Sequence, residues 1–308
     1  MNKFKTTLIM FICITLSFSA VGCNSEQVNT EKSTFPDIEF GYNLVDWEKT
    51  INFVGEPISL TFEINNNEGG AEFGLMVYID GKIQKFVTAD NDKLAYMHCC
   101  YLQTKQNKSI EISLCPQGLD IGEYDLTIIV MLNPNFMAKE PNYVFGYNHK
   151  ISYAYTKIKI NTVTDLKTKT GIVESAFLIS NEEKKKYINE GINRLEQRAY
   201  NVILNNGEEE NRKIILNKKD LDVEVKILGG SNATYRVTAF LNHEPILIND
   251  EYNDFLLNSS IDSYSILNLN YNYENIDNNS VFYIIAIPIN EIEENAYPLK
   301  SDSIVVIK

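Results

Sequence analysis

The stretch that decides the fold is FGLMVYIDGKIQKFV, residues 73–87. Two apolar runs flank Asp80-Gly81, and this dipeptide between strand-like runs predicts a β-hairpin. Seven residues separate this stretch from PISLTFEIN at 57–65, which places four apolar residues at alternate positions, as expected of a strand with one buried face. The folded part of the chain is therefore expected to begin as antiparallel β-structure.

The same order of patterns occurs a second time. YRVTAFLNHEPILI at 235–248 carries Asn242-His243 at its turn, and LDVEVKIL at 221–228 precedes it. Three later runs also match: SIEISLC (109–115) with SYSILNLN (263–270), GEYDLTIIVML (122–132) with VFYIIAIP (281–288), and KISYAYTKIKI (150–160) with SDSIVVIK (301–308). Five elements in one order predict a duplicated β-rich unit.

Many short strands separated by turn residues are typical of a β-sandwich. The segment Gly122-Glu123-Tyr124-Asp125-Leu126 resembles the G-x-Y-x-L start of the sixth strand in immunoglobulin-like domains, in which the tyrosine hydroxyl ties down a corner. The expected fold is all-β, with two tandem immunoglobulin-like β-sandwiches at 35–163 and 172–308. The polar, lysine-rich segment 164–171 is expected to link them.

One helix is expected, inserted in the second sandwich. Ser180-Asn181-Glu182-Glu183 has the form of a capping box, and Ile188, Ile192 and Leu195 after it share one helical face. The first unit lacks this insertion.

The N-terminus has the order of a secretory signal peptide. Lys3 and Lys5 precede an apolar run at 8–18, which is shorter than the roughly 20 residues that span a membrane, and small residues follow. Ala20-Val21-Gly22-Cys23 resembles the lipobox of bacterial lipoproteins, with alanine where leucine is more common. The alternative is an ordinary signal peptide that happens to contain a cysteine.

The resemblance implies that residues 1–22 are removed and that Cys23 carries the lipid, a diacylglyceryl thioether with palmitate-type chains. Residues 23–34 would then be the lipidated N-terminus and a flexible leash, because NSEQVNTEKST holds one aliphatic residue and no aromatic one. The expected location is the bacterial cell envelope, on the extracytoplasmic side of the membrane.

The charge of the chain limits its partners. Loss of residues 1–22 changes the formal net charge from −13 to −15. An acidic chain does not attract nucleic acid or an anionic bilayer surface. Nucleic acid is therefore not an expected partner, and membrane attachment must come from the lipid on Cys23.

Catalytic motifs are missing from the sequence. The chain has three histidines, His98, His149 and His243, on different expected elements. There is no G-x-S-x-G, H-E-x-x-H, Walker or G-x-G-x-x-G motif. We expect no enzyme activity, no catalytic residue and no cofactor, and we expect His243 to be solvated in its turn.

Cys99, Cys100 and Cys115 have three interpretations. Neighbouring residues of a strand point to opposite faces, so Cys99 and Cys100 should diverge. The favoured interpretation is buried, inert thiols, and the second is a cross-strand disulfide between Cys100 and Cys115. A metal site of His98, Cys100 and Cys115 is the least favoured interpretation, because the C-x₂-C spacing and a fourth ligand are missing. No metal is expected.

A long tyrosine-rich connection spans residues 133–149. Loops of this length in compact domains are often functional, and tyrosine is enriched at interfaces. One hypothesis is that Tyr143, Phe145 and Tyr147 form part of a partner-binding surface. The alternatives, packing against their own sandwich or against the second one, are together favoured over it.

These observations favour a non-catalytic, surface-anchored lipoprotein that serves as a binding or envelope-interaction module for a protein, peptide or glycan. One alternative is an envelope-associated hydrolase or hydrolase accessory. Another is the solute-binding lipoprotein of a transporter, which would require alternating strands and helices.

Overall fold

The computed structural model describes residues 38–45, 50–137, 145, 148–164, 168–173, 176–189, 199–209, 213–230, 232–289 and 296–308. The expected signal peptide, Cys23 and the leash lie outside these residues, as do Tyr143 and Tyr147. Within the described ranges, no helix has the length and apolar character needed to span a membrane.

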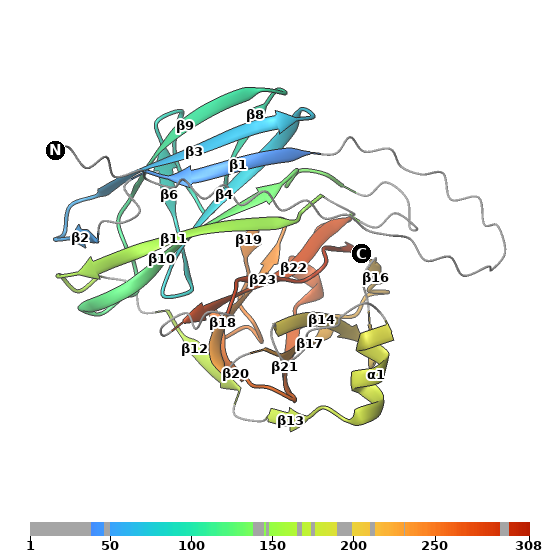
Figure 1. Cartoon of the computed structure of the whole chain (residues 1–308). Coiled ribbons are helices and arrows are strands. Elements are labelled where there is room, and N and C mark those ends of the chain that lie inside the picture. The colour runs from blue at the N-terminus through green and yellow to red at the C-terminus, as the bar shows by residue number, and fades with distance from the viewer. Residues whose placement is uncertain are drawn as a thin grey trace, which may run out of the picture. The chain divides into compact units, whose positions relative to one another are not determined.

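The first half of the chain forms two facing sheets (Figure 1). Sheet A contains, in spatial order, β1 (Glu39–Leu44), β3 (Ile58–Glu68), β9 (Gln106–Leu114), β6 (Phe86–Thr88) and β7 (Asn91–Ala95). Sheet B contains β2 (Ile51–Phe53), β11 (Ile151–Ile160), β10 (Gly122–Leu132), β4 (Ala71–Ile79) and β5 (Lys82–Gln84), and β8 (His98–Leu102) also pairs with β4.

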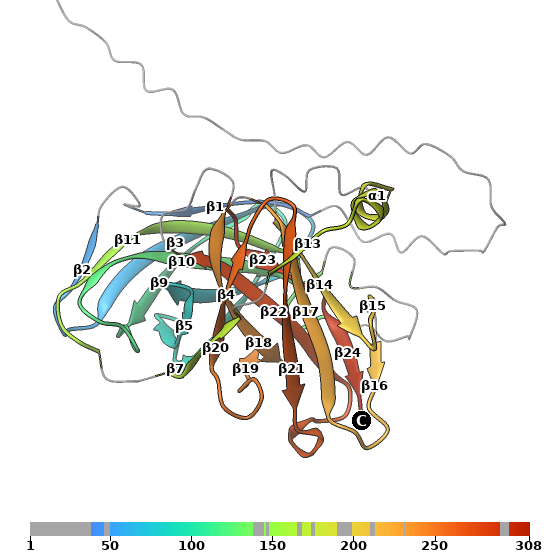
Figure 2. The ribbon, with the colours of Figure 1, turned by 90° about the horizontal axis from the view of Figure 1, so that it is seen from below.

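The second half repeats this arrangement, in yellow to red in Figure 2. Sheet C contains β12 (Thr170–Val173), β20 (Asp254–Ser259), β18 (Ala233–Leu241), β22 (Ser280–Ile289), β24 (Ile304–Ile307) and β16 (Lys213–Ile215), with β19 (Glu244–Pro245) on β18 and β23 (Leu299–Lys300) on β22. Sheet D contains β13 (Ala176–Leu178), β21 (Ser263–Tyr271), β17 (Leu221–Gly229), β14 (Ala199–Asn205) and β15 (Glu208–Glu209).

The strand pairings confirm the duplication expected from the sequence. The antiparallel pairs β3·β9 and β4·β10 of the first half correspond to β17·β21 and β18·β22 of the second. Each half also contains a parallel pair, which is less common: β2·β11 in the first half corresponds to β16·β24 in the second. The fold is all-β, with two tandem immunoglobulin-like β-sandwiches.

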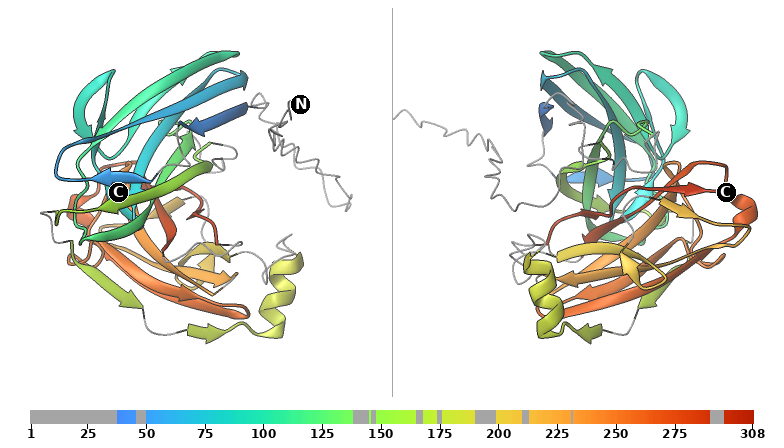
Figure 3. Two further views of the ribbon diagram at one scale, coloured as in Figure 1. Left: turned by 60° about the vertical axis from the view of Figure 1, so that its left-hand side comes forward. Right: turned by 90° about the vertical axis from the view of Figure 1, so that its right-hand side faces the viewer.

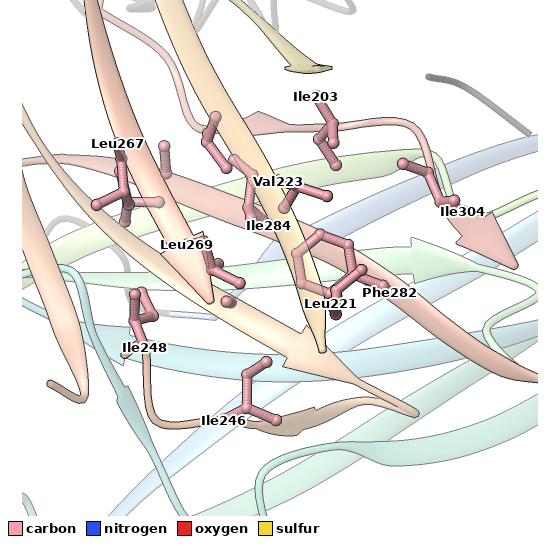
Figure 4. Close-up of a cluster of buried hydrophobic side chains, with 14 of the residues drawn as sticks. Ile203, Leu221, Val223, Ile246, Ile248, Leu267, Leu269, Phe282, Ile284 and Ile304 are labelled. Atoms are coloured by element: carbon pink, nitrogen blue, oxygen red, sulfur yellow. The ribbon is translucent and has the colours of Figure 1, made fainter. Parts of the chain in front are cut away.

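Each sandwich has its own apolar core between its two sheets. In the first, Phe62 of β3, Phe73 of β4 and Ile128 of β10 are fully buried. In the second, Figure 4 shows Val223, Leu269, Phe282 and their neighbours pointing into the space between sheets C and D. The alternation of apolar residues in β3 and β17 produces these cores, because alternate side chains of a strand share a face.

Two local signals in the sequence have the expected geometry. Asp80 and Gly81 have φ values of 51° and 70°, the left-handed conformation required at both central positions of a type I′ hairpin turn. The Tyr124 hydroxyl donates to the carbonyl oxygen of Asp120 at 3.2 Å, as in the corner of immunoglobulin-like domains.

The helix α1 (Asn181–Asn189) begins directly after Ser180, as the capping box at 180–183 predicts. The Ser180 hydroxyl accepts from the Glu183 amide at 3.1 Å, and the Glu183 carboxylate accepts from the Ser180 amide at 3.0 Å. Figure 3 shows α1 following β13. The helix is held on sheet D by Tyr187, which is buried, and by Lys226 of β17, whose ammonium lies 3.0 Å from the Glu183 carboxylate. Ile192 and Leu195 lie outside the described residues.

The expected linker needs one correction. Strand β12 begins at Thr170, inside the segment 164–171, because Thr170 and Gly171 pair with β20. Pro36–Lys308 also forms one compact unit by its contacts. Separate folding of 35–163 and 172–308 therefore stays a prediction.

Candidate functional site

The outer faces of sheets B and C are buried against each other. Met76 and Tyr78 of β4 and Ile129 and Met131 of β10 pack with Phe240 of β18 and with Val281, Tyr283, Ile285 and Ile287 of β22. The Phe240 and Tyr283 rings stack with centroids 5.2 Å apart. Burial raises the pKa of the Tyr78 and Tyr283 hydroxyls well above the usual value. We call this shared face the junction.

A buried cation, Arg236 of β18, lies at one end of the junction. Its Nε donates to the Asp80 carbonyl at 2.7 Å, Nη2 donates to the Asp80 carboxylate at 3.0 Å, and Nη1 donates to Asp254 at 2.8 Å and to Thr170 Oγ1 at 3.2 Å. A Cβ on Gly81 would lie 2.8 Å from Arg236 Cβ, so the turn of the first sandwich can approach because glycine stands there. The arginine therefore joins the two sandwiches directly.

His149 lies at the other end of the junction and is 2% exposed. Its Nε2 is 3.0 Å from the Phe136 carbonyl oxygen and its Nδ1 is 2.8 Å from Ser303 Oγ. Because a carbonyl only accepts, Nε2 carries the proton and Nδ1 accepts from the serine hydroxyl. Burial, and then the Lys300 charge, lower the pKa of His149 to about 3, so the ring is neutral.

The sequence predicts that His243 is solvated, but in the structure it is partly buried beside His149. Its Nε2 donates to the Pro134 carbonyl at 2.7 Å and its Nδ1 accepts from the Tyr283 hydroxyl at 2.9 Å. Burial lowers the pKa of His243. The expectation was wrong because the hairpin turn, although polar, lies against the 133–137 segment of the first sandwich.

Lys300 completes this polar cluster. Its ammonium donates to Ser303 Oγ at 2.8 Å and to the Ser301 carbonyl at 2.9 Å, and lies 4.5 Å from the centre of the Tyr283 ring. Burial lowers the pKa of Lys300 to about 7. A chain of hydrogen bonds thus runs from Lys300 through Ser303 and His149 to the first sandwich.

Serine, histidine and lysine within hydrogen-bond distance have the form of an activated nucleophile. Ser303 is 1% exposed and His149 2% exposed, however, so a substrate carbonyl cannot reach the hydroxyl. The arrangement can position the two sandwiches, but it cannot attack a substrate from solution.

The expected tyrosine-rich surface needs a correction at Phe145. This side chain is 5% exposed and packs in the junction, with its ring centroid 4.5 Å from that of His149. Phe145 therefore packs within the molecule and does not form part of an exposed partner-binding surface, because its apolar ring is covered by the chain's own residues. Tyr143 and Tyr147 lie outside the described residues.

The interpretation as a disulfide between Cys100 and Cys115 is wrong, because Cys99, Cys100 and Cys115 are all free. The first interpretation, buried thiols, is wrong for Cys99 and Cys115, which are exposed, and Cys100 is half-buried. The disulfide required neighbouring strands, but β8 pairs with β4 in sheet B whereas β9, which precedes Cys115, pairs in sheet A. His98 instead contacts the Phe86 carbonyl through Nε2 at 2.8 Å. In the parts of the chain that the structure describes, no three of His, Cys, Asp and Glu gather as a possible metal site.

Beside β8 lies an open hollow of about 280 Å³. Apolar Leu75 and Ile110 and the half-buried Cys100 line it, together with Thr88 and His98. Asp90 and Lys108 also line it, and their side chains form an ion pair of 2.6 Å. This hollow, rather than the sealed junction, is the candidate binding site.

The thiols of β8 are expected to react slowly. Burial, with the Glu72 carboxylate nearby, raises the pKa of Cys99 to about 12, and burial raises the pKa of Cys100. Cys99 is exposed and Cys100 is half-buried, so a reagent can reach Cys99, but the thiolate is the nucleophile and the raised pKa disfavours it. A thiol reagent at neutral pH should therefore label the peptide containing these two residues more slowly than it labels free cysteine. Mass spectrometry of timed samples measures both rates. Faster labelling of the β8 peptide than of free cysteine would contradict the expectation.

Three polar residues of the junction, Arg236, Lys300 and Ser303, were not predicted from the sequence. Arg236 is a cation inside the apolar run YRVTAFL, and that break in the pattern was the available signal. Lys300 and Ser303 stand in short polar stretches with no distinguishing pattern, and their roles follow from tertiary contacts.

No family model matches the chain, and no curated protein matches it. Among solved structures it is similar to the CARDB domain of a Pyrococcus furiosus protein in complex with di-metal ions, at 16% identity and a TM-score of 0.25, over 42% of this chain and 96% of that one. It is also similar to fibronectin(III)-like modules of Clostridium thermocellum CbhA, at 8% identity and a TM-score of 0.22, over 87% and 93%. A third is the periplasmic chaperone SfaE, at 10% identity and a TM-score of 0.23, over 87% and 99%.

The class of the protein follows from its own sheets. It is an all-β protein of two immunoglobulin-like sandwiches, and sheet B of the first packs against sheet C of the second at the buried junction.

Proposed function

We propose that the chain is a non-catalytic, lipid-anchored binding module of the bacterial cell envelope. Cys23 holds it on the extracytoplasmic side of the membrane, and the leash carries two joined sandwiches to a protein, peptide or glycan partner. The observation that carries the non-catalytic assignment is the burial of the Ser303–His149 pair, which leaves its hydroxyl inaccessible.

The junction supports the role of a binding module. An apolar shared face and the buried Arg236 bonds favour one fixed arrangement of the two sandwiches. A fixed arrangement reduces the entropy lost when a partner binds. An open hollow on the flank of the first sandwich then supplies a place for contact.

Cys23→Ala tests the anchor. The variant is expected to move from the membrane fraction to the soluble fraction and to lose incorporation of labelled palmitate, because the thiol is the site of lipid attachment. Cys13→Ala, within the apolar run, is the matched control and should remain labelled. If Cys23→Ala stays labelled and membrane-bound like the unchanged chain, the anchor is elsewhere.

Binding is tested by cross-linking the membrane-anchored chain in intact cells and identifying the captured molecules. The proposal expects one envelope component to be captured reproducibly and to bind the purified chain. Turnover of an envelope polymer by the purified chain, abolished by a single side-chain substitution, would instead show an enzyme.

A further inference from the structure

Strand β8 leaves one edge of sheet B open. It pairs with β4 from Ala71↔Leu102 to Leu75↔His98, and no other described strand pairs with it. Its sequence, HCCYL, contains no lysine, aspartate, glutamate or proline. Proteins commonly protect exposed edges with such residues, so an unprotected edge is suited to pairing with another strand.

The equivalent edge of the second sandwich is occupied. The duplication places β20 on β18 as β8 lies on β4, with the pair Tyr235↔Leu257 corresponding to Phe73↔Cys100. Strand β12 lies along the outer side of β20 and runs parallel to it, as Figure 1 shows. The fold therefore already contains one example of a strand added at this edge.

The residues of β12 show what the edge accepts. Gly171 pairs with Phe255, and a Cβ at Gly171 would overlap the phenylalanine ring. Ile172 is 68% exposed, whereas Val173 pairs with Leu257 and packs against the core. A strand that pairs with this edge therefore has, in order, a small residue (Gly171), a residue that points to solvent (Ile172) and an aliphatic residue that points to the core (Val173).

The hollow lies beside the residue of β8 that corresponds to Leu257, namely Cys100. Its volume of about 280 Å³ leaves room for a side chain to enter beside β8. Leu75 and Ile110 in its lining favour an aliphatic side chain. Asp90 and Lys108 form an ion pair in its lining, so together they add no net charge to it.

We propose that the open edge of β8 binds an extended segment of a partner protein, which runs parallel to β8 with a small residue opposite His98 and an aliphatic residue opposite Cys100. In this mode main-chain hydrogen bonds give affinity and the hollow gives specificity. The inference rests on the proposed function and names its ligand class. The chain's own leash does not supply the pattern, because its one aliphatic residue, Val28, stands two places after Glu26.

The probe is a synthetic peptide with the sequence TKTGIVE, residues 168–174 of this chain. Hydrogen exchange of the full chain is measured with and without it, so that protection at β8 is distinguished from displacement of β12. We expect slower exchange at those amides of His98–Leu102 that face away from β4, because the other amides of the strand already pair with β4. The change Val173→Asp in the peptide should weaken binding at least tenfold, as measured by fluorescence anisotropy.

A matched pair of protein variants tests the hollow. Cys100→Trp fills it and should weaken peptide binding at least tenfold, whereas Cys115→Trp, outside the lining residues, should leave binding unchanged. If Cys100→Trp does not fold, the two peptides on the unchanged chain decide the matter.

Four results would overturn the proposal. The first is that the peptide does not slow exchange at the β8 amides that face away from β4, and the second is that these amides are already protected in the free chain. The third is equal binding of the Val173→Asp peptide. The fourth is binding of a neutral oligosaccharide in place of the peptide, lost in Cys100→Trp, which would assign the hollow to a sugar. Each of these leaves the cross-linking test of the proposed function unaffected.

Discussion

Arg236→Leu is expected to lower the free energy of unfolding by about 3–5 kcal/mol, the range for breaking a buried ion pair from one side. The guanidinium lies between the carboxylates of Asp80 and Asp254, and the substitution leaves both without it. Chemical unfolding at pH 8 measures the loss. The loss should decrease at pH 5, because protonation of a carboxylate relieves the uncompensated charge.

The control is Lys186→Leu, which removes an ion pair with both partners at the surface. The Lys186 ammonium lies 3.0 Å from the Glu209 carboxylate, and the two side chains are 54% and 31% exposed. Its loss should cost no more than about 1 kcal/mol. Equal effects of the two substitutions would show that Arg236 is not buried between the sandwiches.

Acid is expected to weaken the fold through His149. The pKa of this ring is about 3 in the folded chain and about 6.5 when unfolded, so the unfolded chain binds more protons between these values. The contribution is fully present above pH 6.5 and is lost as the pH falls toward 3, by roughly 5 kcal/mol at the acid end. A protonated His149 would also direct a second donor at Ser303 Oγ, which already accepts from Lys300.

His149→Asn isolates this effect. Asparagine tolerates the φ of 61° at this position and does not titrate. Unfolding curves of both proteins from pH 8 to pH 4 are compared, with the difference at pH 8 subtracted. The variant should lose less stability on acidification than the unchanged chain. Parallel curves would contradict a buried neutral His149.

The sequence predicted the fold because each sandwich is encoded locally. Alternation in 57–65, the Asp80-Gly81 turn and the Ser180 capping box are each effects of a few neighbouring residues, and each has its expected geometry. The order of patterns then predicted the duplication. These signals do not depend on contacts between distant segments.

The junction could not be read in the same way. TIIVML in β10 and VFYIIAIP in β22 are apolar at successive positions, which indicates strands buried on both faces, but not what covers the second face. His243 illustrates the limit. Its turn is recognisable from the sequence, whereas its contact with Pro134 joins residues 109 positions apart.

The most direct test of the shared junction is a double-mutant cycle between Asp80 in the first sandwich and Arg236 in the second. Free energies of unfolding are measured for the unchanged chain, Asp80→Asn, Arg236→Leu and the double variant. Asparagine can keep the left-handed turn at position 80. A direct contact predicts a coupling of about 2 kcal/mol, within the range for interacting residues. Additivity within about 0.5 kcal/mol would contradict the junction.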